Sequence, residues 1–80
     1  MRDLHVYVEP VRSGERGEQA TFYSRRADGP LYRWLYAEGH GRWRYSRVHL
    51  DREALRLLRL APWDALPAAL RSRLGEHYLV

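Results

Sequence analysis

The dipeptide Asp28-Gly29 separates two segments rich in aromatic residues, Gln19 to Arg26 and Leu31 to Ala37. Asp-Gly is the strongest short signal for a two-residue hairpin loop, because both central positions of such a turn need a positive φ. The dipeptide therefore predicts that the two segments pair as antiparallel strands. A two-residue loop would place Tyr23 opposite Trp34.

Two further segments extend this hairpin to a sheet. Leu4 to Arg12 alternates and is rich in β-branched and aromatic residues, and Arg42 to Leu50 follows a glycine-bearing turn over residues 38–41. Both patterns are typical of strands. An even-length turn around residue 40 places Trp34 opposite Tyr45, and the first hairpin places Val8 opposite Tyr23.

Strand alternation divides the expected sheet into two faces, and a one-residue slip in any turn would exchange the faces of that strand. One face carries mostly aromatic and aliphatic side chains: Leu4, Val6, Val8, Tyr23, Tyr32, Trp34, Tyr36, Trp43 and Tyr45. The other face mixes arginines with apolar residues: His5, Tyr7, Glu9, Val11, Phe22, Arg26, Leu31, Arg33, Leu35, Arg42, Arg44 and Val48.

The last third of the chain predicts helices. Asp51 is a good N-cap, and Leu50 before it can pack against Leu55 in a hydrophobic staple. Pro62 should end this first helix, and a second should run to Leu74. We expect both helices to cover the ring-rich face, because their leucines otherwise have no surface on which to pack.

Eighty residues suffice for one core only. The sequence therefore predicts a single α+β domain over residues 1–80. We expect a four-stranded antiparallel meander over about residues 4–50, with two short C-terminal helices over about residues 52–75 packed on one face. The apolar tail, residues 76–80, should dock on the sheet or on a partner.

The excess of basic over acidic residues favours an acidic partner. The formal net charge is +4 and the pI is about 10.0, as in many nucleic-acid-binding proteins. All fourteen basic residues are arginine, however, and compositional bias alone would also produce such a usage. The absence of cysteine, of a signal-peptide pattern and of a run of about 18 apolar residues favours a cytoplasmic protein without a membrane segment.

Side chains with catalytic or metal-binding potential are few. There is no cysteine, the serines lie in no nucleophile motif, and the four histidines have no metal-ligand spacing. We therefore expect a protein that is not an enzyme, with no catalytic residue, no metal, no cofactor and no small-molecule substrate.

If the helices cover the ring-rich face, the opposite face should be the binding surface. Arginines on it can neutralise phosphates while aromatic rings stack on bases, which favours single-stranded nucleic acid. An alternative is a protein interface, most simply a two-fold homodimer through the same face. The candidate binding residues are Tyr7, Phe22, Arg26, Arg33, Leu35, Arg42 and Arg44.

Overall fold

A computed structural model describes residues 3–9 and 20–78. The expected turn of the first hairpin and residues 79–80 lie outside this part of the chain. The described elements are β1 (Leu4–Val8), β2 (Phe22–Arg26), β3 (Leu31–Ala37), the 3-10 turn η2 (Glu38–His40), β4 (Arg42–Val48), α1 (Arg52–Leu57), β5 (Arg59–Leu60), the 3-10 turn η3 (Trp63–Ala65) and α2 (Ala68–Tyr78).

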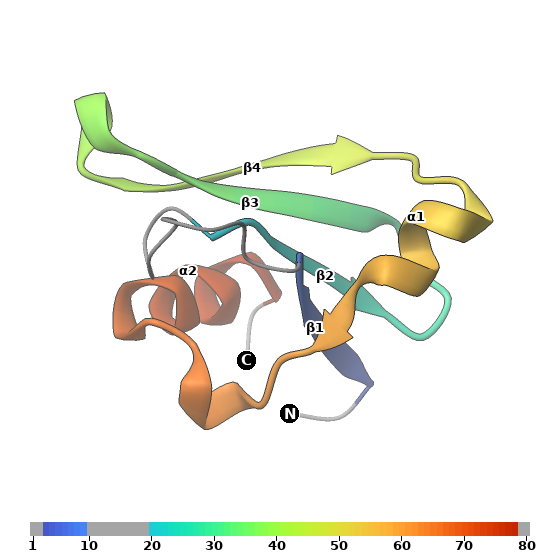
Figure 1. The fold of residues 1–80 in the computed structure, drawn as a ribbon. Helices are drawn as coiled ribbons and strands as arrows, with labels where there is room; N and C mark the ends of the chain where they lie inside the picture. Colours follow the sequence, from blue (N-terminus) through green and yellow to red (C-terminus); the bar gives the residue numbers. More distant parts are fainter. Residues whose placement is uncertain (1–2, 10–19, 79–80) are drawn as a thin grey trace.

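The α+β class and the antiparallel sheet are confirmed, but the sheet has five strands in the order β4-β3-β2-β1-β5 (Figure 1). The additional strand, β5, pairs with β1, and the Ala61 N–H donates to the Val6 carbonyl at 2.8 Å. The first helix is therefore shorter than expected. It ends at Leu57, because Leu58 is already extended and leads the chain back to the open edge of β1.

The register of the central hairpin differs by one residue from the prediction. Phe22, and not Tyr23, lies opposite Trp34. The reason is a three-residue connection in which the Gly29 N–H donates to the Arg26 carbonyl at 3.0 Å, and neither Asp28 nor Gly29 has the positive φ of a two-residue turn.

This slip exchanges the two faces of β2 only. The β1 register is also shifted, with Val8 opposite Phe22, so β1 keeps its expected face. The predicted pair of Trp34 with Tyr45 across β3 and β4 is confirmed, and the same register places Tyr36 opposite Trp43.

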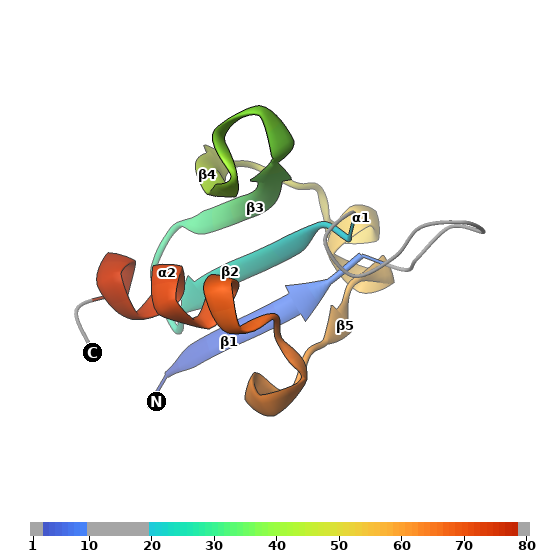
Figure 2. The same cartoon turned by 90° about the vertical axis from the view of Figure 1, so that its left-hand side faces the viewer.

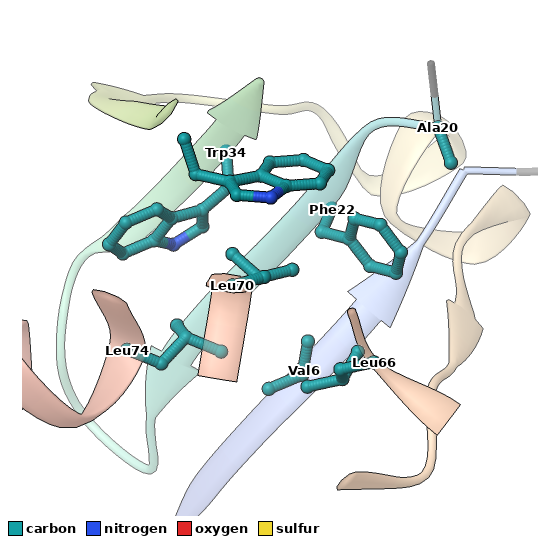
Figure 3. Close-up of a cluster of buried hydrophobic side chains, with 8 residues drawn as sticks. Val6, Ala20, Phe22, Trp34, Leu66, Leu70 and Leu74 are labelled. Carbon is teal, nitrogen blue, oxygen red and sulfur yellow. The ribbon is translucent and has the colours of Figure 1, made fainter. Parts of the chain in front are cut away.

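The core lies between one face of the sheet and α2 (Figure 3). Trp34 and Trp43 are 0% and 1% exposed, which confirms that the ring-rich face is covered. Leucines at helical spacing on and before α2 complete the core against this face: Leu66, Leu70 and Leu74.

The two helices do not share a face, contrary to the prediction. Figure 2 shows α2 in front of the sheet and α1 behind it. Ala54 and Leu58 accordingly line a hollow together with Tyr23 and Arg33, whose side chains point away from the core. The expected N-cap of α1 is present, because Asp51 Oδ1 accepts a hydrogen bond from the Ala54 N–H at 2.8 Å.

Candidate functional site

Two of the seven predicted binding residues do not lie on the expected face, because of the slip in β2. Phe22 is only 7% exposed and its ring meets the edge of Trp43 at 5.6 Å between centroids. Arg26 lies on the α2 side, where Arg26 Nη2 donates to the Tyr78 carbonyl at 2.9 Å. Phe22 therefore belongs to the core, and Arg26 is hydrogen-bonded to the end of α2.

Arg33 lies on the expected face but is engaged within the protein. Its guanidinium covers the ring of Tyr23 at 5.5 Å, and Arg33 Nε donates to Tyr23 Oη at 3.2 Å. Tyr23 in turn donates to Glu9 Oε1 at 2.7 Å. Burial, reinforced by the hydrogen bond to Glu9, raises the pKa of Tyr23, so the phenol stays protonated.

Tyr7 also has partners within the sheet. The guanidinium carbon of Arg25 lies 5.9 Å from its ring centroid, and the ring of His5 stacks at 6.4 Å. Tyr7 is half-buried. The part of this face that was expected to stack on bases is thus largely occupied by contacts within the protein.

The remaining three predicted residues lie together at one end of the β3–β4 hairpin. Leu35 lies opposite Arg44, and Ala37 lies opposite Arg42. Leu35 is 47% exposed, and both arginines are exposed. The structure therefore brings Leu35, Arg42 and Arg44 together on one face of the β3–β4 hairpin, with the two arginines on the edge strand.

A hollow of about 330 Å³ lies along this edge, lined by Arg42, Arg44, Tyr45 and Arg73. We call these four residues the β4 edge surface. The candidate residues chosen from the sequence did not include Tyr45 and Arg73. Tyr45 was assigned to the covered face, and no sequence pattern indicated that Arg73 would reach β4.

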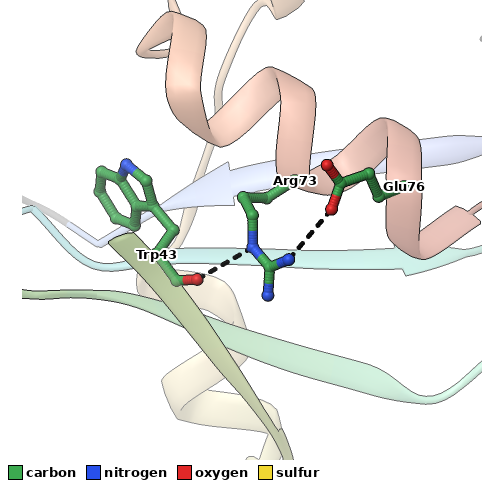
Figure 4. Close-up of polar contacts among 3 residues, drawn as sticks. All are labelled: Trp43, Arg73 and Glu76. Atoms are coloured by element: carbon green, nitrogen blue, oxygen red, sulfur yellow. Dashed lines mark hydrogen bonds and ion pairs between the residues drawn. The ribbon is translucent and has the colours of Figure 1, made fainter. Parts of the chain in front are cut away.

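Arg73 reaches from α2 to the edge strand (Figure 4). Arg73 Nε donates to the Trp43 carbonyl at 3.1 Å, and Nη1 contacts Glu76 Oε2 at 3.1 Å. Its other terminal nitrogen, Nη2, has no hydrogen-bond partner among residues 3–9 and 20–78. Two contacts thus hold the guanidinium in place and leave Nη2 without a partner in the described part of the chain.

Tyr45 is a half-exposed ring held by aromatic neighbours. Its exposed fraction is 48%, and its centroid lies 4.5 Å from His77 and 5.0 Å from Trp34. Burial of His77, together with the positive charge of Arg73, lowers the pKa of that imidazole. Tyr45 therefore packs against a predominantly neutral ring at neutral pH and presents an exposed part to solvent.

The backbone of β4 is also open on this side. The Trp43 carbonyl accepts its bond from Arg73 and therefore points away from β3. Backbone direction alternates along an antiparallel strand, so Tyr45 and Arg47 direct their N–H and carbonyl groups the same way.

The electrostatic character of the β4 edge surface is positive. No Asp or Glu lines the hollow, and Glu76, which pairs with Arg73, has a side chain that is 68% exposed. Arginines on an edge strand also discourage pairing with other strands. The surface can therefore attract an anion while resisting non-specific sheet extension.

Within the described residues, no three His, Asp or Glu side chains gather closely enough to hold a metal ion. The helices in this part of the chain are too short or too polar to cross a membrane. Comparisons with protein-family models, with curated proteins and with solved structures find no match to this chain.

Proposed function

We propose that this protein is a small, non-enzymatic module that binds single-stranded nucleic acid through the β4 edge surface. The observation that carries this proposal is the hollow in which Arg42, Arg44 and Arg73 meet beside the half-exposed ring of Tyr45. Arginine neutralises phosphates and a tyrosine ring stacks on a base of any sequence. Both features lie on one edge, within reach of neighbouring nucleotides.

A single strand suits this surface better than a duplex. Base stacking on Tyr45 needs an unpaired base and contributes about 1–3 kcal/mol. The outward N–H groups of Tyr45 and Arg47 can also donate to phosphate or base oxygens.

The alternative of a protein interface on the face predicted from the sequence has less support. On that face α1 lies against Tyr23 and Arg33, and Leu35 is the one large apolar residue of β1 to β4 on it that is exposed in the described part of the chain. Leu57 and Leu60, which are also exposed, lie towards the β5 border of that face. A single exposed leucine on the central strands is ordinary for a monomer surface.

Fluorescence anisotropy with labelled single-stranded oligonucleotides of mixed sequence tests the proposal. Affinity should fall with salt, the logarithm of the association constant declining by about 0.7 per phosphate contact for each unit of log salt concentration. Absence of binding at low salt would contradict the proposal.

Two double variants with the same change in charge distinguish binding at the β4 edge surface from attraction by the net charge of the protein. Arg42→Glu with Arg44→Glu should weaken binding strongly and reduce the salt slope by about 1.4, corresponding to two lost contacts. Arg52→Glu with Arg56→Glu changes the same charge on α1, where both residues are exposed, and should weaken binding only slightly. Equal losses in both variants would mean that the protein attracts nucleic acid without a defined site.

A further inference from the structure

The opposite edge of the sheet has a different character. Three of the five large exposed hydrophobic residues in the described part of the chain lie in one short segment around β5, namely Leu57, Leu60 and Trp63, at 66%, 68% and 36% exposure. We call these three residues the β5 edge surface. Strand order places it at the edge furthest from β4.

Leu60 lies between two hollows. One, of about 390 Å³, is mixed in character, because His5 and Asp64 line it together with apolar residues such as Leu4 and Trp63. The second, of about 290 Å³, has only apolar lining residues, including Phe22 and Pro62. A protruding leucine beside an apolar hollow is complementary to a copy of itself, as a two-fold interface requires.

The backbone at Leu60 fits the same arrangement. Ala61 directs its N–H to β1, so by alternation Leu60 directs its own N–H and carbonyl away from the sheet. The Leu58 N–H already donates to the Leu55 carbonyl at 3.2 Å, and Pro62 has no N–H. Only Leu60 in this segment can therefore exchange both backbone hydrogen bonds with a second strand, which fixes the register.

The charges at the two edges favour a second copy at β5 and disfavour one at β4. Arg56 and Asp64 each lie four residues from Leu60, on opposite sides of it in the sequence, and antiparallel pairing about Leu60 brings Arg56 of one copy towards Asp64 of the other. Pairing two β4 strands would instead oppose Arg42, Arg44 and Arg47 to one another, and like charges facing each other are destabilising.

We propose that two copies of this chain associate about a two-fold axis at Leu60, through antiparallel pairing of β5 and packing of Leu60 against the partner's apolar hollow. The sheets of both copies then form one continuous sheet, with a β4 edge surface at each outer edge. This proposal does not depend on nucleic-acid binding.

Sedimentation equilibrium over a range of concentrations tests the proposal. The wild-type protein should approach twice its chain mass of 9.5 kDa as concentration rises. Leu60→Asp should remain at the mass of a single chain, because two carboxylates would meet at the axis. Leu35→Asp changes an exposed leucine on β3, away from β5, and should leave the dimer intact.

Circular dichroism and urea unfolding at low concentration establish that each variant is folded. Should Leu60→Asp fail to fold, Leu60→Ser serves as the second variant, and it should weaken dimerisation at least tenfold. A wild-type protein that stays monomeric at millimolar concentration would overturn the proposal and leave a different protein as the occupant of this surface. A Leu60 variant that is folded and fully dimeric would overturn it as well.

Discussion

Trp34 Nε1 donates a hydrogen bond to Ser24 Oγ at 2.8 Å, and both side chains are 0% exposed. Ser24 Oγ also lies 2.7 Å from Tyr78 Oη, which joins the central strands to the last turn of α2. A buried indole N–H needs such an acceptor, because leaving it unpaired costs about 1–3 kcal/mol. The pair therefore ties the registers of β2 and β3 to the position of the C-terminal helix.

Replacing Ser24 by alanine should lower the free energy of unfolding by about 1–3 kcal/mol, because the buried Trp34 N–H loses its acceptor. Urea unfolding followed by tryptophan fluorescence measures the change. Ser46→Ala, an exposed serine on β4, is the matched control and should change the stability by less than about 0.5 kcal/mol. Equal stability of the two variants would argue against the Ser24 contact.

Trp34 and Leu35 are adjacent in β3 and point to opposite faces, so they test which face is core. Trp34→Ala should lower the free energy of unfolding by about 3–5 kcal/mol. This is close to the whole stability that the core of a domain of this size supplies. Leu35→Ala removes a side chain that is 47% exposed and should cost about 0.5 kcal/mol or less. Circular dichroism during thermal unfolding compares them, and a folded Trp34→Ala protein would contradict the assignment.

His77 should make the protein less stable in acid. Burial and the charge of Arg73 lower the pKa of His77 below its ordinary value of 6.5, so the unfolded chain binds a proton more readily than the folded one. Stability should therefore fall as pH decreases through 6.5 towards the folded pKa.

His77→Phe should reduce this acid loss, since phenylalanine cannot be protonated. His40→Phe is the control, because His40 is exposed in η2, and it should keep the acid dependence of the wild type. Urea unfolding at a series of pH values provides the comparison. An unchanged pH profile in the His77 variant would assign the acid loss to other groups.

The Arg73–Glu76 pair predicts two changes of opposite sign in oligonucleotide binding. Arg73→Gln removes a cation from the β4 edge surface and should weaken binding severalfold. Glu76→Gln frees Arg73 Nη1 and removes the neighbouring negative charge, and should strengthen binding at low salt. Anisotropy titrations measure both, and a Glu76→Gln protein that binds more weakly would count against the site.

The pattern of β3 and β4 was sufficient to predict their pairing and the burial of Trp34 and Trp43, because alternation and an even-length turn leave one consistent register. The Asp51 cap was equally local and therefore predictable. These features depend on residues close together in the sequence.

The features that the sequence analysis predicted wrongly or missed depend on tertiary contacts, which a local sequence pattern does not reveal. The loop at Asp28-Gly29 takes three residues, which places Phe22 and the small Ser24 on the core face, where Ser24 bonds to Trp34 and Tyr78. The strand β5 forms because β1 has an unpaired edge, and no periodicity in two residues reveals that. Arg73 reaches β4 only after α2 has packed, so tertiary structure creates this part of the site.

The helix α2 supplies Leu70 and Leu74 to the core, yet it follows the strands of the sheet in the chain and is synthesised after them. Until α2 has left the ribosome, the rings of Trp34 and Trp43 lack the cover of these two leucines, and a sheet with a partly bare hydrophobic face is prone to aggregate. The chain can therefore reach its native state only after α2, Ala68–Tyr78, has been translated. A nascent chain stalled before residue 68 would depend on chaperones to remain soluble.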